Sequence, residues 1–154
     1  LRRRRRLSHL GLGALAPPIN PSLHPMERTM ILPGQRLQRS RRKGSKLPDG
    51  AVYVGRPTMW GNPFMVARWG HARSVILHKE WLAGRVGAHR LERMQFSPAE
   101  IDAIERLRCR VLTQLHHLAG KDLACWCPLT SHWCHAETLL QLARDHAEYE
   151  RHAA

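Results

Sequence analysis

The sequence predicts an α/β protein: a single domain with a small, mostly parallel sheet flanked by helices, preceded by a disordered basic tail. Two short β-prone segments, 51–55 and 123–127, are separated by two helical patterns, and a third helical pattern follows the second segment. A strand–helix–strand connection of this length favours parallel pairing, because antiparallel neighbours need only a tight turn. All five tryptophans lie between Trp60 and Trp133, so we expect the hydrophobic core in this part of the chain.

The N-terminal part of the chain differs in composition from the rest. Residues 1–46 carry a formal net charge of +11, whereas the remainder carries +2. Repeated prolines, few aromatic side chains and several arginine clusters predict that residues 1–50 are mostly mobile, because this composition buries too little apolar surface to order itself. We therefore expect three parts: a disordered or spurious extension over residues 1–35, an α/β domain over residues 36–146 and a C-terminal tail over residues 147–154.

The charge distribution also restricts the partners and the compartment. The basic N-terminal tail is suited to sequence-independent contact with nucleic acid, while the nearly neutral remainder gives no such signal. Residues 2–16 imitate a secretory signal, but Ser8, His9 and two glycines interrupt the apolar part. No segment is long and apolar enough to predict a membrane span, and the crowded cysteines fit a reducing compartment better than a disulfide framework. We expect a cytoplasmic protein without a membrane partner, and the sequence leaves its oligomeric state open.

Hydrophobic periodicity and end signals predict the helices. The first is expected over 72–83. The most strongly marked helix spans 98–118, where Ser97 and Glu100 have the spacing of a capping box. One stripe of apolar side chains follows this helix at helical spacing: Ile101, Ile104, Leu107, Val111, Leu115 and Leu118. A final helix is expected over about 134–144.

The loop after the first expected strand carries the candidate ligand-binding residues Arg56, Trp60, Gly61, Asn62 and Pro63. Ligands of α/β proteins bind where strands end in loops. Arg56 can clamp a phosphate or carboxylate, Trp60 offers a stacking face, and Asn62 can orient an amide or a base edge. Gly61 and Pro63 fix a backbone that a ligand can approach closely. The alternative is a structural loop that packs Trp60 into the core and leaves Arg56 at the surface.

Thiol and imidazole side chains are concentrated between Cys125 and His135. Strand alternation puts Cys125 and Cys127 on one face with Cα atoms roughly 6.5 Å apart, so both sulfurs can reach one metal ion. Together with Cys134 and His135 they form a Cys₃His set, which is a structural zinc set. The spacing differs from the usual C-x-x-C knuckle, so zinc is one of several interpretations.

A second interpretation of the same segment is catalytic. Cys134 begins the last helix, whose first N–H groups and dipole would stabilise a thiolate or bind a substrate anion. His135 is the candidate base, and Glu137 in the first helical turn is the candidate acid or base. A third interpretation is that the cysteines only fill the core, because buried cysteine behaves as a small hydrophobic side chain.

Four blocks in order resemble a bacterial and phage family catalogued as domain-of-unknown-function family 4326, and they cover residues 39–44, 52–64, 120–127 and 134–140. The resemblance extends from about Arg36 to Ala143 and leaves residues 1–25 outside. It implies a compact α/β fold and supplies no reaction. The family usually has a shorter, proline-containing spacer before its Cys-His pair, and this chain departs from that pattern between Pro128 and Trp133.

These observations leave two functions open and do not decide whether the protein is an enzyme. The first is a pocket for a nucleotide-like or other anionic ligand, formed by the 56–64 loop and the 125–135 segment, that acts on nucleotides or nucleic acid. The alternative is a zinc-stabilised interaction module without catalysis. Nucleic-acid contact through the basic tail would modify the first function.

Overall fold

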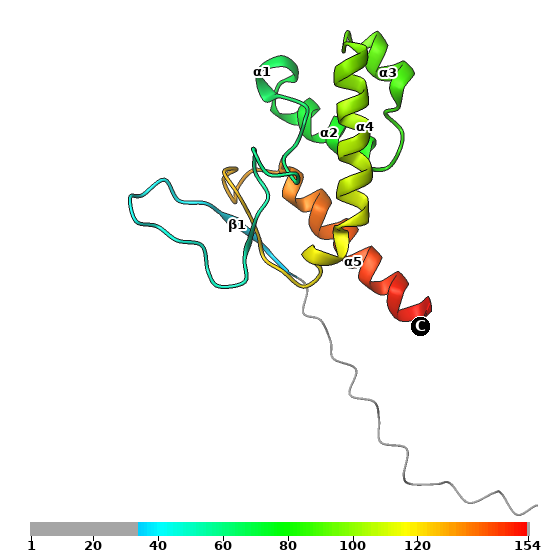
Figure 1. Ribbon diagram of the computed structural model, residues 1–154. Helices are drawn as coiled ribbons and strands as arrows, with labels where there is room; N and C mark the ends of the chain where they lie inside the picture. The colour runs from blue at the N-terminus through cyan, green and yellow to red at the C-terminus, as the bar shows by residue number, and fades with distance from the viewer. Residues whose placement is uncertain (1–33, 154) are drawn as a thin grey trace, which may run out of the picture. The chain divides into compact units, whose positions relative to one another are not determined.

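The computed structural model describes residues 34–153, and every structural statement below concerns this part of the chain. Three short parallel strands form the sheet, in the spatial order β1-β3-β2 (Figure 1). They are β1 (Arg36–Gln38), β2 (Val52–Tyr53) and β3 (Leu123–Cys125). The prediction of a small parallel sheet flanked by helices is confirmed. Residues 1–33 of the disordered or spurious extension expected over residues 1–35 lie outside the described residues.

β1 and β2 both pair in parallel with the central strand β3, so the carboxyl ends of all three strands lie at the same edge of the sheet. Both edges of β3 are paired, with Arg36 opposite Leu123 on one side and Val52 opposite Leu123 on the other. The ladder continues past the strand ends, where the N–H groups of Arg39 and Val54 donate to the carbonyls of Cys125 and Ala124 at 2.7 and 2.9 Å. The residues that follow each strand therefore lie close together, as expected for parallel strands.

β1 lies within residues 1–50, predicted to be mostly mobile, and at the start of the α/β domain expected from residue 36. Residues 36–38 form a strand that the sequence analysis did not predict. The strand is ordered by pairing with β3, a long-range contact that local composition does not reveal. Gly34 enters this strand against the backbone of Lys121, where an added Cβ atom would lie 1.8 Å from the Lys121 carbonyl oxygen. Only glycine fits this close approach.

The helices are α1 (Val66–Trp69), α2 (His71–Leu82), α3 (Ala88–Arg93), α4 (Pro98–Thr113), the 3₁₀ turn η1 (Leu115–Leu118) and α5 (His135–Ala153). The expected long helix is confirmed but divides at Gln114 into α4 and η1. Its capping box is confirmed too, because Ser97 N–H donates to Glu100 Oε2 at 2.7 Å and Glu100 N–H donates to Ser97 Oγ at 3.3 Å. The short helices α1 and α3 were not predicted.

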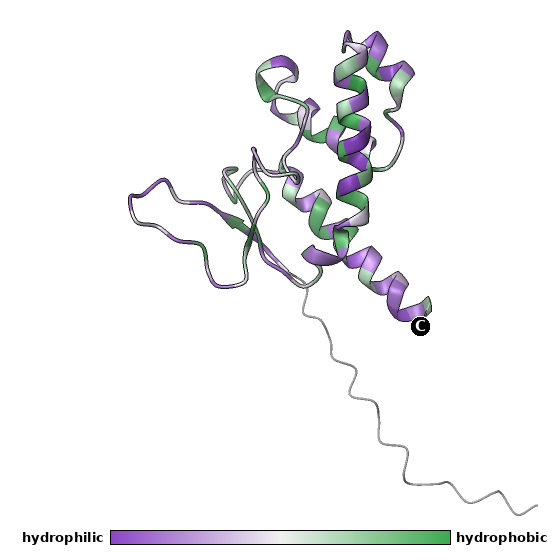
Figure 2. Cartoon of the chain, in the orientation of Figure 1, coloured by the Kyte–Doolittle hydropathy of each residue, from purple (hydrophilic) through white to green (hydrophobic). Residues whose placement is uncertain are grey.

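The final helix is longer than predicted. α5 continues to Ala153, so residues 147–153 are its last turns and do not form a separate tail. The apolar pattern ends near Ala143, but polar contacts at helical spacing continue, with His146 Nδ1 3.7 Å from the Glu150 carboxylate and an ion pair at 4.0 Å between Arg151 and Glu148. Figure 2 shows this end of α5 as mainly hydrophilic. No helix of the described residues is long and apolar enough to cross a membrane.

The core lies between β3 and the helices α2, α4, η1 and α5. Its buried side chains include Leu77, Trp81, Ile104, Val111, Leu118, Leu123 and Leu139. Trp60, Phe64 and the two buried cysteines belong to the same cluster. The thiol groups are therefore held at the edge of a packed apolar core, where their positions are fixed by the surrounding side chains.

Candidate metal centre

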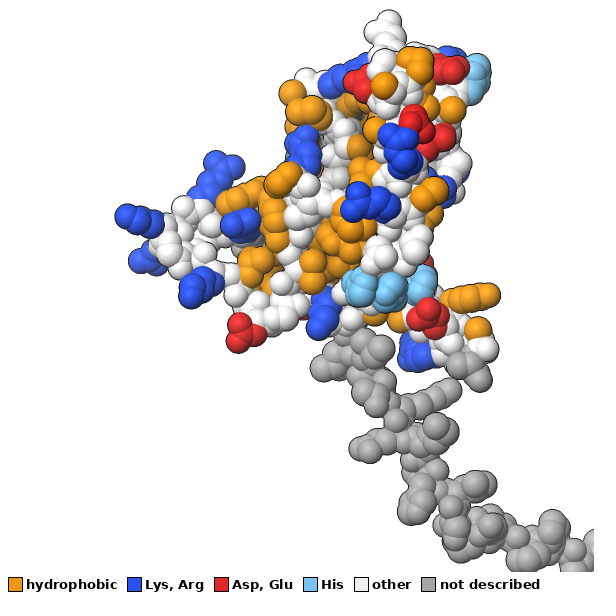
Figure 3. Space-filling model, in the orientation of Figure 1, with side chains coloured by type: hydrophobic (Ala, Val, Ile, Leu, Met, Phe, Trp, Pro, Cys, Tyr) orange, Lys and Arg blue, Asp and Glu red, His pale blue; other side chains and the backbone are white. Residues whose placement is uncertain are grey.

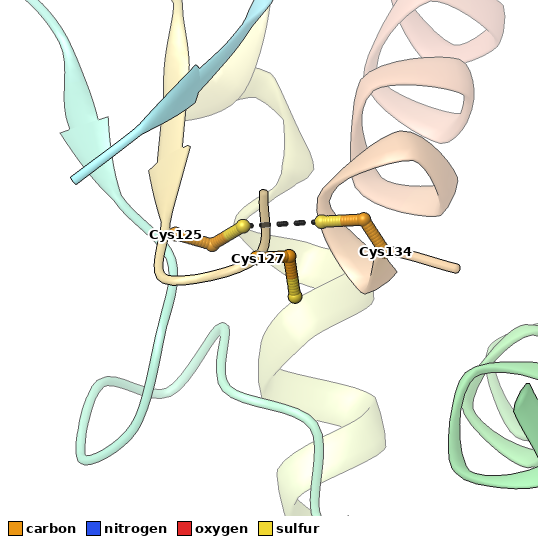
Figure 4. Close-up of side chains that lie close together, drawn as sticks. All are labelled: Cys125, Cys127 and Cys134. Atoms are coloured by element: carbon orange, nitrogen blue, oxygen red, sulfur yellow. Dashed lines mark hydrogen bonds between the residues drawn. The ribbon is translucent and has the colours of Figure 1, made fainter. Parts of the chain in front are cut away.

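Three thiol groups converge where β3 ends and α5 begins (Figure 4). Cys125 is the last residue of β3, Cys127 lies just beyond it, and Cys134 immediately precedes α5. Their sulfur atoms all lie within 4.8 Å of one another, and those of Cys125 and Cys134 are 3.1 Å apart. Tetrahedral zinc with thiolate bonds would hold its sulfurs about 3.8 Å apart. The distances between the three sulfur atoms are thus close to those expected for thiolates that share one zinc ion.

Arg36 of β1 holds the loop that returns the chain from Cys127 to Cys134. Its guanidinium donates to the carbonyls of Pro128, Leu129 and Ser131 at 3.3, 2.5 and 3.0 Å. The same group lies 3.4 Å from the carboxylate of Glu137, and its side chain is only 8% exposed. Sequence reasoning missed this positioning residue, because it lies more than 90 residues away from the loop that it holds and no local motif marks it.

His135 was the expected fourth ligand, but the structure does not bring it into the thiol group. Among the described residues, that group contains only the three cysteines. The His135 Nε2 lies 2.8 Å from the carbonyl oxygen of Val54 and donates to it, because a carbonyl can only accept. The ring is buried and packs edge-on against His78, with centroids 5.5 Å apart. His135 instead joins α5 to the end of β2.

His71 is the imidazole that approaches one of the thiols, that of Cys127, although its nitrogen does not belong to the group of three sulfurs that lie within 4.8 Å of one another. It is the first residue of α2, and its Nε2 lies 3.8 Å from the Cys127 sulfur. A nitrogen and a sulfur sharing one tetrahedral zinc would be about 3.6 Å apart. Sequence reasoning missed His71, because it stands 56 positions before Cys127 and no local motif marks it.

The thiols share their protons unequally. The pKa of Cys134 is lowered, because Cys125 and Cys127 hydrogen-bond to its sulfur and the N–H of Ala136 at the start of α5 adds to this. The pKa of Cys125 is raised by its hydrogen bonds to Cys127 and Cys134 and by burial. The hydrogen bonds within the group therefore favour a thiolate at Cys134 over one at Cys125. A bound divalent cation would favour deprotonation of all three.

A cavity of about 370 Å³ adjoins the thiols. Its lining residues come from the first loop (Gly55, Arg56, Asn62 and Phe64), from α1 (Val66), from α2 (His71, Ser74 and Val75) and from the 125–135 segment (Cys125, Trp126, Cys127 and His135). The two segments that the sequence analysis joined into one pocket thus line the same cavity. Cys127 and His71, whose sulfur and nitrogen are 3.8 Å apart, both line it.

The residues expected to bind a ligand occupy different positions around this cavity. Arg56 is exposed and lines it. Trp60 is 8% exposed within the core and does not line it, and neither does the half-buried Pro63. Gly61 packs beneath Arg56, where a Cβ atom would lie 2.8 Å from the Arg56 Cγ. Asn62 lines the cavity, but its polar atoms are already engaged within the protein.

Asn62 ties the loop to α2. Its amide donates to the carbonyl and hydroxyl oxygens of Ser74 at 3.0 and 2.9 Å, and its carbonyl accepts from the N–H of Phe64 at 2.8 Å. The Ser74 hydroxyl donates in turn to the Phe64 carbonyl. This network is buried and satisfies the side chains of both residues. Asn62 thus shapes the cavity wall, and its hydrogen-bonding groups are not free to contact a ligand.

The expected catalytic residues are not arranged as a set around the cavity. Cys134 is 1% exposed and does not line it, although its sulfur belongs to the thiol group behind the wall. His135 lines it but is bonded to Val54. Glu137 is exposed and paired with Arg36, away from the lining residues. The arrangement is better suited to holding a metal ion than to acid–base chemistry by these three residues.

The fold and the thiol group define a small α/β domain with a candidate metal centre. Residues 37–145 match the model of the family described as Domain of unknown function (DUF4326). The match covers most of the chain, so the protein belongs to this family, as the resemblance predicted. No curated protein and no solved structure matches the chain.

Proposed function

We propose that the protein is a zinc-binding domain in which Cys125, Cys127 and Cys134 ligate one Zn²⁺ and His71 supplies the fourth ligand. The observation that carries this proposal is the convergence of three sulfur atoms within 4.8 Å, with an imidazole nitrogen 3.8 Å from one of them. Thiolate and imidazole are the ligands that zinc prefers, and a tetrahedral set requires four. The proposal keeps the expected cysteines and replaces His135 by His71.

The metal would act as a cross-link between the ends of three elements. The ligands come from the end of β3, the residue before α5 and the first residue of α2. A structural zinc ion at such a junction contributes directly to folding. Zinc-bound thiolates are maintained in a reducing compartment, so we propose a cytoplasmic location.

Elemental analysis of the purified protein tests the metal site. We expect close to one zinc ion per chain, and a marked loss of zinc in Cys125→Ser, Cys127→Ser and Cys134→Ser. Cys109→Ser is the matched control, because Cys109 is exposed and lies outside the thiol group. His71→Ala should weaken zinc affinity while leaving the thiols in place.

Cobalt substitution provides a second measurement that does not require variants. Co²⁺ bound to three thiolates and one imidazole gives intense visible bands and thiolate charge-transfer absorption. We expect these bands in the wild-type protein and altered bands in His71→Ala. A metal-free preparation with undiminished stability, and no cobalt–thiolate spectrum on titration, would exclude the site.

The adjoining cavity supports a second candidate function, the binding of a nucleotide-like or other anionic ligand. Arg56 lines the cavity, and no carboxylate of residues 34–153 forms an ion pair with it. A free guanidinium at the wall of a cavity is suited to a phosphate or carboxylate. The second candidate is a binding function alone, because His135 and Glu137 are engaged within the protein.

Thermal-shift screening against nucleoside mono-, di- and triphosphates tests this second candidate. A ligand that raises the melting temperature of the wild-type protein should do so much less for Arg56→Ala. Arg110→Ala, which removes an exposed arginine from α4, should respond like the wild type. Equal responses in all three proteins would remove Arg56 from the site.

A further inference from the structure

The loop between β1 and β2 is a concentrated positive surface. Residues 39–46 contain five lysines and arginines and no acidic residue. The loop projects from the sheet (Figure 1), and lysine and arginine side chains surround it in the space-filling view (Figure 3). None of these five side chains forms an ion pair with a carboxylate of the described residues. Their charge is therefore available to a partner.

Trp126 is an exposed aromatic side chain beside this loop. It stands between two candidate metal ligands, yet it is 41% exposed. The Arg39 and Arg41 guanidinium carbons lie 5.0 and 5.4 Å from its ring centroid. Arg39 also lies 4.7 Å from the centroid of Tyr53, whose ring meets Trp126 edge-on at 6.4 Å. The aromatic and cationic groups thus form one surface.

This surface is hollowed. A cavity of about 440 Å³ is lined by Gln38, Arg39, Ser40, Arg41 and Trp126. Trp126 also lines the cavity beside the thiols, so one ring borders both. A flexible polyanion bound along the loop would therefore contact the Trp126 ring.

We infer that Trp126 and the basic loop 39–46 form a binding site for single-stranded nucleic acid. An unpaired base stacks on Trp126, while Arg39 and Arg41 contact the flanking phosphates. Single strands are favoured over duplexes, because the faces of paired bases are covered by their neighbours, whereas an unpaired base can present its face to an aromatic side chain. The site uses neither Trp60 nor Arg56, and none of its contacts with the nucleic acid is made by a proposed zinc ligand.

Fluorescence anisotropy with the full-length protein and a fluorescein-labelled 12-nucleotide oligothymidylate tests the stacking step. We expect Trp126→Ala to raise the Kd roughly 5- to 150-fold, the range that one base–aromatic stack represents, and Trp126→Phe to restore part of the affinity. The matched control is Trp133→Ala, because Trp133 is 43% exposed in the following loop and lies outside the surface. Its Kd should stay near that of the wild type.

Salt dependence tests the phosphate contacts. Arg41→Ala should weaken binding and lower the slope of log K against log salt concentration by about 0.7, the value of one phosphate contact on a single strand. Arg110→Ala should leave the slope unchanged. Arg41 lies outside the thiol group, so this variant decides the proposal even if a Trp126 variant disturbs the fold.

Three results would overturn the inference: an unchanged Kd in both Trp126→Ala and Arg41→Ala, binding of a 12-base-pair duplex as tight as that of the single strand, or no binding of the oligonucleotide by the wild type. Attachment to phosphatidylserine vesicles without oligonucleotide binding would identify an anionic membrane as the partner in its place. Zinc content is measured in every variant, so loss of the metal site is distinguished from loss of stacking.

Discussion

At the scale of single residues, the site depends on polar groups whose bonds are all made within the protein. The Asn62 amide donates to the carbonyl and hydroxyl oxygens of Ser74 beside the cavity, and His135 donates to the carbonyl of Val54. Buried polar atoms cost free energy unless they are paired. His78 Nδ1 and the neighbouring Trp81 Nε1 are exceptions, because both are buried without a partner among the described residues.

Asn62→Ala tests the network around the cavity wall. The variant leaves the Ser74 carbonyl and the Phe64 N–H without their partner, so we expect the free energy of unfolding to fall by about 1–3 kcal/mol. Urea denaturation measures the change. Gln141→Ala, which removes an exposed amide, should change stability by less than about 0.5 kcal/mol. Equal effects of the two substitutions would contradict a structural role for Asn62.

His78 makes stability depend on pH. Burial, reinforced by His135, lowers its pKa to about 3. In the unfolded chain the group takes up a proton near pH 6.5, so below that pH the unfolded state binds more protons and stability falls as the pH drops toward 3. Between pH 7 and 5 we expect the wild type to lose about 2 kcal/mol of unfolding free energy relative to His78→Leu. Parallel pH profiles for the two proteins would show that His78 does not carry this effect.

At the scale of secondary-structure elements, β1 and α5 control the thiol group without contributing a sulfur. β1 supplies Arg36, which holds three carbonyls of the returning loop and the carboxylate of Glu137. The start of α5 supplies the N–H of Ala136 to the Cys134 sulfur. Residues that hydrogen-bond around metal ligands and orient them contribute strongly to metal affinity, although they do not bind the metal themselves.

Arg36→Lys tests this positioning role. Lysine keeps the charge but cannot reproduce the planar fork that reaches three carbonyls. We expect zinc affinity to fall about 10-fold, at the lower end of the range for residues behind a metal site, with the zinc stoichiometry unchanged at saturation. Competition with a chromogenic chelator measures the affinity. The control is Arg39→Lys on the same segment. A similar loss of zinc affinity in both variants would show that Arg36 has no specific role in positioning the ligands.

Some elements were predictable and others were not, for a common physical reason. β3, α2 and the capped start of α4 carry local signals in the form of β-prone runs, periodic apolar residues and the Ser97–Glu100 pair. The nearness of the cysteines followed from their short separation in sequence. β1 and His71 take their roles from contacts with residues that are distant in sequence. A single sequence shows local patterns only, so it does not reveal such contacts.

At the scale of the whole molecule, the proposed zinc ion would connect parts of the domain that are far apart in sequence. The sheet contributes through β3 and the helical part through the starts of α2 and α5. A ligand that binds only the folded state stabilises it by mass action. The domain and its metal would then unfold and dissociate together.

Removal of the metal tests this coupling. We expect a strong chelator to lower the melting temperature, since a metal present at about 1,000 times its Kd stabilises the fold by about 4 kcal/mol. Differential scanning calorimetry with and without chelator measures the shift, and restored Zn²⁺ should reverse it. The Cys109→Ser protein should respond like the wild type. No shift in either protein would mean that the fold does not rely on a metal.

The close approach of Gly34 to the backbone of Lys121 has a consequence for residues far from it in sequence. Any side chain here would push the first strand away from its neighbour and carry the guanidinium two residues later out of reach of the carbonyls it grips. A substitution at Gly34 would thereby displace the loop that positions the cysteine sulfurs, some ninety residues later in the chain. A mutation that looks peripheral in the printed sequence would strike the centre of the domain.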